Sequence, residues 1–251
     1  MIERIEGIVT EIIRHNDAHN VVTLFTRTRG RMAFLVPVGK SKSGRLRNSV
    51  LNLMAVVGAD VNLRPGKELH PLRQVHPLRL WHGIYSHPVK SSLLFFLTEF
   101  SHRLLRQYPA DERLWDYLIG ALELLDGLPD RELANFHIAF LIRLLPLVGI
   151  LPVAEKWLPG MEFDMLSGEM VDKDKILDGL GSDRIRSVLL SEGESRLVPL
   201  LARMNFTNMS RFRFTPSQRY LALERMLAYY SVHLPLGTDF KTLPVLRELF
   251  S

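Results

Sequence analysis

The sequence predicts a two-domain α+β fold, with a small β-barrel followed by an all-helical C-terminal domain. Two patterns predict it. In residues 1–80, β-branched residues form short segments bounded by polar turn residues, which is typical of strands. From Pro88 onward, apolar residues recur at spacings of three and four, which is typical of helices. We therefore expect domains at residues 1–80 and 81–251.

Five strands are expected in the first domain, with no helix between them. Gly30 permits a tight hairpin between Phe25 and Phe34. Pro37 has no amide hydrogen and belongs near a strand end, and the fourth strand is expected to bend at Gly58. Five short strands without intervening helices predict a small antiparallel barrel. The expected strands are residues 6–14, 20–28, 31–39, 49–63 and 68–79.

The second domain carries recognisable helix boundaries. Pro88 starts one helix, and Asp111 and Gly127 are expected to cap the two ends of the next. Thr215, followed by Pro216 and by Gln218, forms a capping-box pattern. The expected helices are residues 88–108, 111–127, 130–149, 183–192, 194–204 and 215–234.

Composition excludes several classes of protein. The chain has no cysteine, which excludes disulfides and thiolate metal sites. Residues 136–154 are strongly apolar, but a charge such as Arg143 at a bilayer centre costs about 2.5–3.5 kcal/mol and Pro146 ends the helix. We expect a buried core helix there, no membrane association, and a cytoplasmic protein without a signal peptide.

Positive charge is concentrated near the N-terminus. Residues 1–80 hold 13 Lys and Arg against 6 Asp and Glu, whereas the rest of the chain holds 19 against 21. No acid occurs between Asp17 and Asp60. Cations grouped on a small barrel are typical of nucleic-acid binding through phosphate neutralisation, although a merely solvated surface is the simpler interpretation. The candidate DNA-binding residues are Arg27, Arg29, Arg31, Lys40, Lys42, Arg45 and Arg47.

Two aromatic residues of this region have two possible roles. Phe25 and Phe34 either serve as stacking platforms for bases or point inward as core residues. The apolar segment MAFLVPV between the basic loops is expected to be the strand that carries them.

Catalytic and metal-binding signals are weak. His70, His76, His82 and His87 are spaced by five or six residues, which matches no compact ligand pair, so we expect no metal. Neither a phosphate-binding loop nor a nucleophile elbow occurs. We therefore expect a protein without enzymatic activity and without a cofactor.

A possible peptide site lies in the helical half. Phe136, Phe140 and Arg143 fall on successive turns, and an apolar groove edged by Arg suits a peptide that ends in an aromatic residue and a carboxylate. Alternatively, the two phenylalanines are core residues and only Arg143 reaches the surface.

The chain resembles the RecO family of bacterial recombination mediators. The resemblance rests on Gly7–Val9, on VTLFT at 22–26 followed by Gly30, and on the basic loop GKSKSGRLR. It continues in LLPLVGILP, with Leu144, Leu145, Gly149 and Pro152, and in FDMLSGEMV at 163–171. The last segment resembles the zinc module of many members, here degenerate near 155–175 because the four cysteines are absent.

The resemblance implies an N-terminal OB-fold joined to a helical domain. It further implies binding of single- and double-stranded DNA, annealing of complementary strands, and loading of RecA together with RecR onto DNA coated by single-stranded DNA-binding protein, whose acidic C-terminal tail is an expected partner. Zinc, found in many members, is not expected here. An adaptor that binds an acidic protein and an RNA-binding module remain alternatives.

Overall fold

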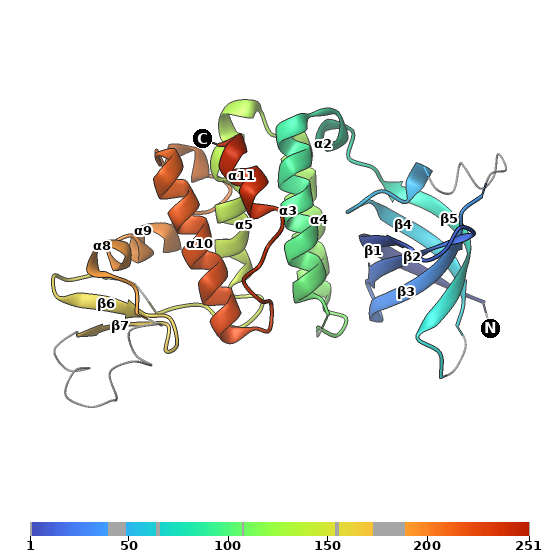
Figure 1. Ribbon diagram of the computed structural model, residues 1–251, viewed down its shortest axis with the longest axis horizontal. Coiled ribbons are helices and arrows are strands. Elements are labelled where there is room, and N and C mark those ends of the chain that lie inside the picture. Colours follow the sequence, from blue (N-terminus) through green and yellow to red (C-terminus); the bar gives the residue numbers. More distant parts are fainter. Residues whose placement is uncertain are drawn as a thin grey trace. The chain divides into compact units, whose positions relative to one another are not determined.

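The computed structural model describes residues 2–39, 49–63, 66–106, 108–153, 156–172 and 189–250. The chain forms two compact units (Figure 1). Unit 1 comprises Met1–Leu128 together with Asp239–Phe250, and unit 2 comprises Pro129–Thr238. The chain therefore leaves unit 1 at Leu128 and returns to it at Asp239. The predicted division of the chain at residue 80 remains a prediction.

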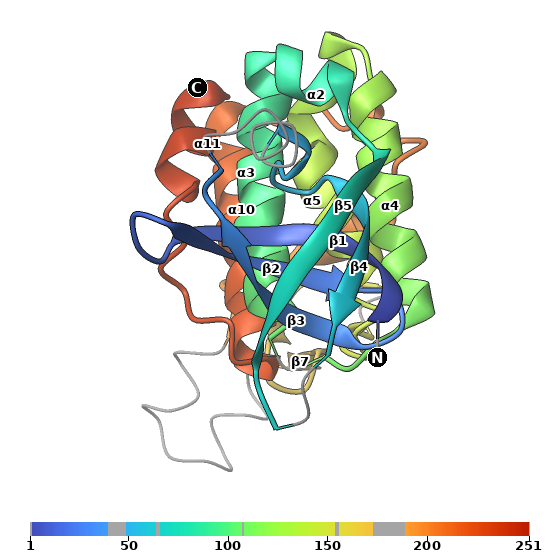
Figure 2. The same cartoon turned by 90° about the vertical axis from the view of Figure 1, so that its right-hand side faces the viewer.

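Unit 1 contains a closed five-stranded barrel of order β1-β2-β3-β5-β4. Its β3 and β5 strands pair in parallel, and the other neighbouring strands pair antiparallel. β1 and β5, which are not neighbours, cross at a steep angle (Figure 2). This is an OB-fold, which confirms the predicted fold class. The strands are β1 (Ile2–Arg14), β2 (His19–Thr26), β3 (Gly30–Pro37), β4 (Val56–Asn62) and β5 (Leu69–Arg79).

Alternating side chains of the strands fill the barrel. Val22 and Leu24 of β2 face Phe34 and Val36 of β3 within one buried cluster. Because the side-chain period of a strand is two, Phe25 lies on the other face, where its ring meets Trp115 at a centroid distance of 6.3 Å. Phe25 and Phe34 are both completely buried, so the core interpretation holds for both and neither offers a stacking platform.

The fourth strand is shorter than predicted. We expected residues 49–63 to be extended, but β4 begins at Val56. Met54 has a positive φ of 61°, and its carbonyl accepts a 2.7 Å hydrogen bond from the indole of Trp81. Its amide donates to the carbonyl of Val9 at 2.7 Å. These bonds hold the segment before β4 as a turn, which residue propensities alone did not reveal.

The helices of unit 1 include α2 (His82–Ser86), α3 (Pro88–Leu104), α4 (Glu112–Gly127) and α11 (Leu243–Leu249). The predicted start of α3 at Pro88 and the Asp111 cap of α4 are confirmed. The Asp111 carboxylate accepts bonds from the amides of Arg113 at 2.8 Å and Leu114 at 3.1 Å. α2 and α11 were not predicted from the sequence.

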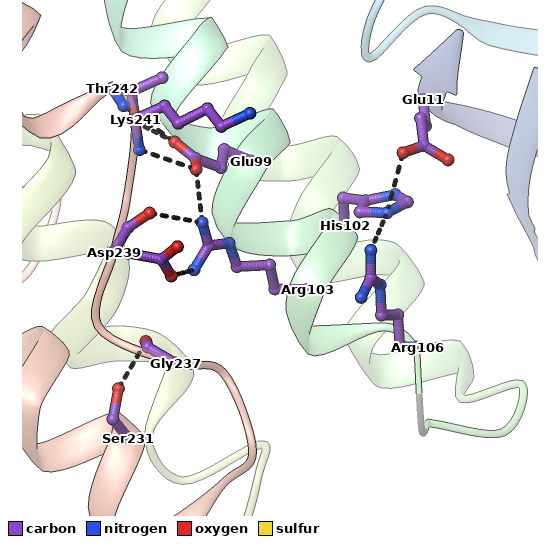
Figure 3. Close-up of polar contacts among 10 residues, drawn as sticks. All are labelled: Glu11, Glu99, His102, Arg103, Arg106, Ser231, Gly237, Asp239, Lys241 and Thr242. Carbon is purple, nitrogen blue, oxygen red and sulfur yellow. Dashed lines mark hydrogen bonds and ion pairs between the residues drawn. The ribbon is translucent and has the colours of Figure 1, made fainter. Parts of the chain in front are cut away.

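The C-terminal segment is attached to α3 by polar contacts (Figure 3). The Glu99 carboxylate accepts bonds from the backbone amides of Lys241 and Thr242, both at 2.9 Å. It also pairs with Arg103 at 2.7 Å, and Arg103 in turn bonds the Asp239 carboxylate at 3.1 Å. The Arg103 guanidinium lies 4.2 Å from the Phe240 ring centroid. These contacts fix α11 against α3.

Unit 2 is mainly helical. Its elements are η1 (Asp130–Asn135), α5 (Phe136–Leu144), α8 (Glu192–Ser195), α9 (Val198–Ala202), η2 (Met209–Arg211) and α10 (Pro216–His233), with the hairpin of β6 (Met161–Asp164) and β7 (Glu169–Asp172). The capping box of Thr215 and Gln218 at the start of α10 is confirmed. The predicted helix at 130–149 is instead one 3-10 segment and the shorter α5. Most of the predicted helix at 183–192 lies outside the described residues.

The β6–β7 hairpin is a pair of strands within the predicted helical half. It occupies the segment that resembles a zinc module. Phe163 is buried, its amide donates to the Ser195 hydroxyl at 2.7 Å, and its ring lies 5.8 Å from that of Tyr229. Packing and hydrogen bonds therefore hold this hairpin in place.

Of the apolar segment 136–154, predicted to be a buried core helix, only Phe136–Leu144 is a helix, and Leu151 and Val153 are exposed. Every residue of α5 except Arg143 is buried. Within the described part of the chain, no helix is both long and apolar enough to cross a membrane.

His137 of α5 provides a test of this core. It is completely buried, and burial, reinforced by the charge of Arg219, lowers its pKa from 6.5 to about 3. Below pH 6.5 the unfolded chain therefore binds a proton that the folded chain does not, and stability falls as the pH falls. We predict that this residue lowers the free energy of unfolding by about 2 kcal/mol between pH 7 and pH 5. Denaturant titrations should show a smaller loss in His137→Gln, and an equal loss in both proteins would contradict the prediction.

Candidate nucleic-acid interface

The β2–β3 hairpin carries the first three candidate cations, and the fold brings acids to two of them. Arg27 contacts Glu112 of α4 at 2.5 Å and Glu6 of β1 at 3.8 Å. The hydrogen bond and charge of Glu112 raise the pKa of Arg27 above its ordinary value. A DNA phosphate would have to compete with these carboxylates for the guanidinium.

Arg29 is paired more completely. Its Nε and one terminal nitrogen donate to the two oxygens of Glu3, each at 2.8 Å. This two-bond geometry is the strongest that Arg forms with a carboxylate. The bond to Arg29 lowers the pKa of Glu3, so the pair stays ionised near neutral pH.

The remaining acids of the barrel domain are also largely occupied. Arg4 pairs with Asp60 at 3.5 Å, and Arg14 pairs with Asp17. Glu11 contacts the Nε2 atom of His102 at 3.2 Å. Arg79 pairs with Glu123 of α4. Arg14 and Asp17 are close in sequence, whereas the acids that reach Arg4 and Arg79 are distant from them in the chain.

Arg31 differs from its two neighbours. It is exposed on β3 and forms no ion pair with any residue that the structure describes. The other four candidates, Lys40, Lys42, Arg45 and Arg47, lie outside the described residues.

One of these pairings was detectable in the sequence. β1 and β2 are consecutive antiparallel strands, and Gly7 lies opposite Thr26. Extending that register by one position sets Glu6 opposite Arg27. The pairing with Glu112 was not detectable, because it depends on how α4 packs on the barrel.

The three residues proposed for peptide binding differ in burial in the structure. Phe136 and Phe140 are completely buried, and Phe136 stacks on Phe206 at 5.4 Å. Both therefore belong to the core of unit 2, the alternative that the sequence left open. Arg143 alone is exposed, with no ion pair among the described residues.

Arg143 lies beside an apolar cavity that the sequence did not reveal. The cavity has a volume of about 330 Å³ and lies within unit 2. Arg143 and Arg225 are the two cations of its wall, and Arg225 is held by Glu194 at 2.5 Å. Its apolar lining includes Leu145, Leu151, Met165, Leu197, Leu201 and Tyr229.

The residues of this chain do not fit a zinc site of the kind that the family resemblance implies for many members. It has no cysteine, and the described residues include no group of three His, Asp or Glu side chains close enough to share a metal ion. The hairpin at the corresponding place carries Asp164 and Glu169, but the Asp164 oxygens accept bonds from the amides of Leu166 and Ser167.

Comparison with known proteins identifies the family. Residues 1–81 match the model for the N-terminal part of recombination protein O, and residues 86–243 match that for its C-terminal part. The DNA repair protein RecO of Phocaeicola vulgatus is 31% identical over 251 residues, covering all of both chains. Those of Bacteroides fragilis and Porphyromonas gingivalis are 29% and 31% identical, covering 100% and 97% of both chains. The chain therefore belongs to the RecO family of DNA repair proteins.

Proposed function

We propose that this protein is a non-enzymatic mediator of recombinational repair in the cytoplasm. It binds single- and double-stranded DNA through the barrel, anneals complementary strands, and acts with RecR to load RecA onto DNA covered by single-stranded DNA-binding protein. Family membership supports a role in repair. The OB-fold supports strand binding, since such barrels commonly hold single strands in a basic groove.

The observation that carries the proposal is the positive charge left after internal pairing. Of the seven candidate cations, Arg27 and Arg29 have carboxylate partners. Arg31 has none among the described residues, and the basic loop contributes Lys40, Lys42, Arg45 and Arg47 with no acid nearby in sequence. These five are the cations we assign to phosphate, with Arg27 and Arg29 in a secondary role.

The cavity beside Arg143 supports the proposed contact with the acidic tail of single-stranded DNA-binding protein. Such a tail ends in an aromatic ring and a carboxylate. The apolar wall suits the ring, and Arg143 offers a guanidinium without a partner among the described residues. Because Phe136 and Phe140 are buried, we place the ring in this cavity and not against those two residues.

The first prediction concerns salt. Replacing Lys40, Lys42, Arg45 and Arg47 by Gln together should weaken single-strand binding and reduce the log–log salt slope by about 2–3, at about 0.7 per phosphate. Fluorescence anisotropy at several salt concentrations measures the slope. The control replaces four exposed arginines of unit 2, Arg131, Arg203, Arg211 and Arg213, and so removes the same charge.

Equal slopes in the two variants would contradict the proposed interface.

Competition experiments separate the alternative functions. Displacement of labelled DNA by RNA at equal concentration would favour the RNA-binding alternative. Binding of an acidic protein that unlabelled oligonucleotides cannot displace would favour the adaptor.

The second prediction concerns the tail peptide. Calorimetric titration should show binding to the wild type and at least tenfold weaker binding to Arg143→Ala, because the terminal carboxylate loses its charged partner. Arg131→Ala, which removes another exposed arginine of unit 2, is the control and should bind normally. Circular dichroism confirms folding. Unchanged affinity in folded Arg143→Ala would remove the site, and no binding to the wild type would remove the partner.

The third prediction concerns metal. Untagged protein should contain less than a stoichiometric amount of zinc, and its melting temperature should not change on chelation, because packing around Phe163 holds the β6–β7 hairpin. Elemental analysis and melting curves with and without chelator test this. Stoichiometric zinc that is lost together with the folded state would show that the chain has a metal site.

A further inference from the structure

A groove in unit 1, outside the predicted interface, combines an exposed ring with cations. It has a volume of about 540 Å³ and lies between β1, α3 and α11. From Ser92 to Arg103 its wall follows one face of α3 for three turns, about 16 Å.

The middle of this groove is apolar and open. The Phe95 side chain is 51% exposed, whereas Phe96 and Phe100 of the same helix are completely buried. Ile12 of β1 and Val245 of α11, also exposed, lie in the same groove. An aromatic ring held open on a rigid helix is the kind of platform on which a base stacks, whatever its sequence.

Cations lie along the same groove, and its acids are already engaged. Glu99 holds the Lys241 and Thr242 amides and Arg103, and Glu11 contacts His102 and accepts a bond from Thr23 (Figure 3). Arg106 and Lys241 are exposed, with no ion pair among the described residues. Glu99 is thus balanced by Arg103, and Arg106 and Lys241 remain as positive charges that can attract an anionic ligand.

His102 leaves the Arg106 charge available. Its Nε2 atom lies 3.2 Å from Arg106 as well as 3.2 Å from Glu11. Burial is the main cause that lowers the pKa of His102; the charge of Glu11 opposes it, and the charges of Arg106, Arg31 and Arg103 lower it further. A neutral imidazole at this place cannot neutralise Arg106, and it occupies one of five guanidinium N–H groups at most.

The exposed cation of the barrel lies near the groove. The charge of Arg31 is among those that lower the pKa of His102, which lines the groove. Gly30, which precedes Arg31, packs so closely on the segment after α3 that a Cβ atom there would lie 3.0 Å from the Ala110 nitrogen. Arg31 therefore begins beside the segment that follows α3.

We propose that this groove is a second DNA-contact site, one that binds only single strands: a base stacks on Phe95 while Arg106 and Lys241 hold the flanking phosphates. The inference rests on the proposed DNA binding and deepens it. In a duplex, bases are paired and stacked, so their faces cannot reach Phe95. The barrel cations, which contact only phosphates, accept either form of DNA. The groove therefore gives single strands a contact that duplexes do not make.

The test compares Phe95 variants on two DNA probes, an oligothymidine and a duplex of equal length. Phe95→Ala should weaken oligothymidine binding about 5- to 100-fold and leave duplex affinity unchanged. Phe95→Leu, which stays apolar but has no ring, should lose nearly as much affinity for oligothymidine, whereas Phe95→Tyr should bind oligothymidine as the wild type does. Leu124→Ala, at an exposed apolar position of α4 outside the groove, is the control.

A second readout detects the stacking itself. In Phe95→Trp, oligothymidine should quench a fluorescence component absent from the wild type, whose own signal comes from the buried Trp81 and Trp115 and from the half-buried Trp157 of unit 2, outside the groove. Replacing Arg106 and Lys241 by Gln should reduce the salt slope on single strands by about 1.4, or 0.7 for each phosphate.

The outcomes separate this inference from the proposed function. If the wild type binds no DNA, both fail. If the basic-loop variant behaves as predicted but Phe95→Ala binds oligothymidine normally, the proposed DNA binding stands and the inference about the groove is wrong. The inference is also wrong in that case if an acidic peptide binds in the groove. An equal loss of affinity for the single strand and the duplex in Phe95→Ala would also overturn the inference, because base stacking would not be the cause.

Discussion

The charge distribution of unit 1 depends on strand β1. It closes the barrel by pairing with β2 on one side and β4 on the other. Because the barrel interior is filled with apolar side chains, the acids of β1 must remain on the outside. From there Glu3 binds Arg29, Glu6 lies near Arg27, and Glu11 contacts His102. β1 thus supplies the acid that pairs with Arg29 and shares Arg27 with Glu112 of α4.

This constraint separates structural from functional arginines. Exposed ion pairs add little to stability, on the order of 0–1 kcal/mol each, so Glu3 and Glu6 have a greater effect on binding than on folding. A phosphate gains less from an arginine whose carboxylate partner it must displace. Positive charge is therefore most available at Arg31, at Arg106 and Lys241, and, as proposed, in the basic loop that follows β3.

Local sequence patterns predicted much of the fold. The strand pattern, the capping residues Asp111 and Thr215, and the end of β3 at Pro37 all depend on neighbouring residues, and the structure confirms them. The turn at Met54 was missed because its bonds to Val9 and Trp81 join segments that are distant in the chain. The hairpin around Phe163 was missed for the same reason, since Ser195 and Tyr229 hold it.

The candidate sites were harder to predict than the fold. Counting charges along the chain could not show that Glu112 of α4 reaches Arg27. Helical spacing placed Phe136, Phe140 and Arg143 on successive turns, but a helix surrounded by other elements buries rings on several faces, and only Arg143 remained exposed. The sequence did not single out Phe95, because it lies within the apolar run LLFFL, where composition does not distinguish an exposed ring from a buried one.

The central claim is that internal pairing, and not the number of arginines, decides which cations bind DNA. The most direct measurement is the salt slope of single-strand binding for Arg27→Gln/Arg29→Gln beside the wild type. The account predicts nearly equal slopes, because Glu112 and Glu3 already neutralise these two arginines. A slope reduced by about 1.4, the value for two lost phosphate contacts, would contradict it.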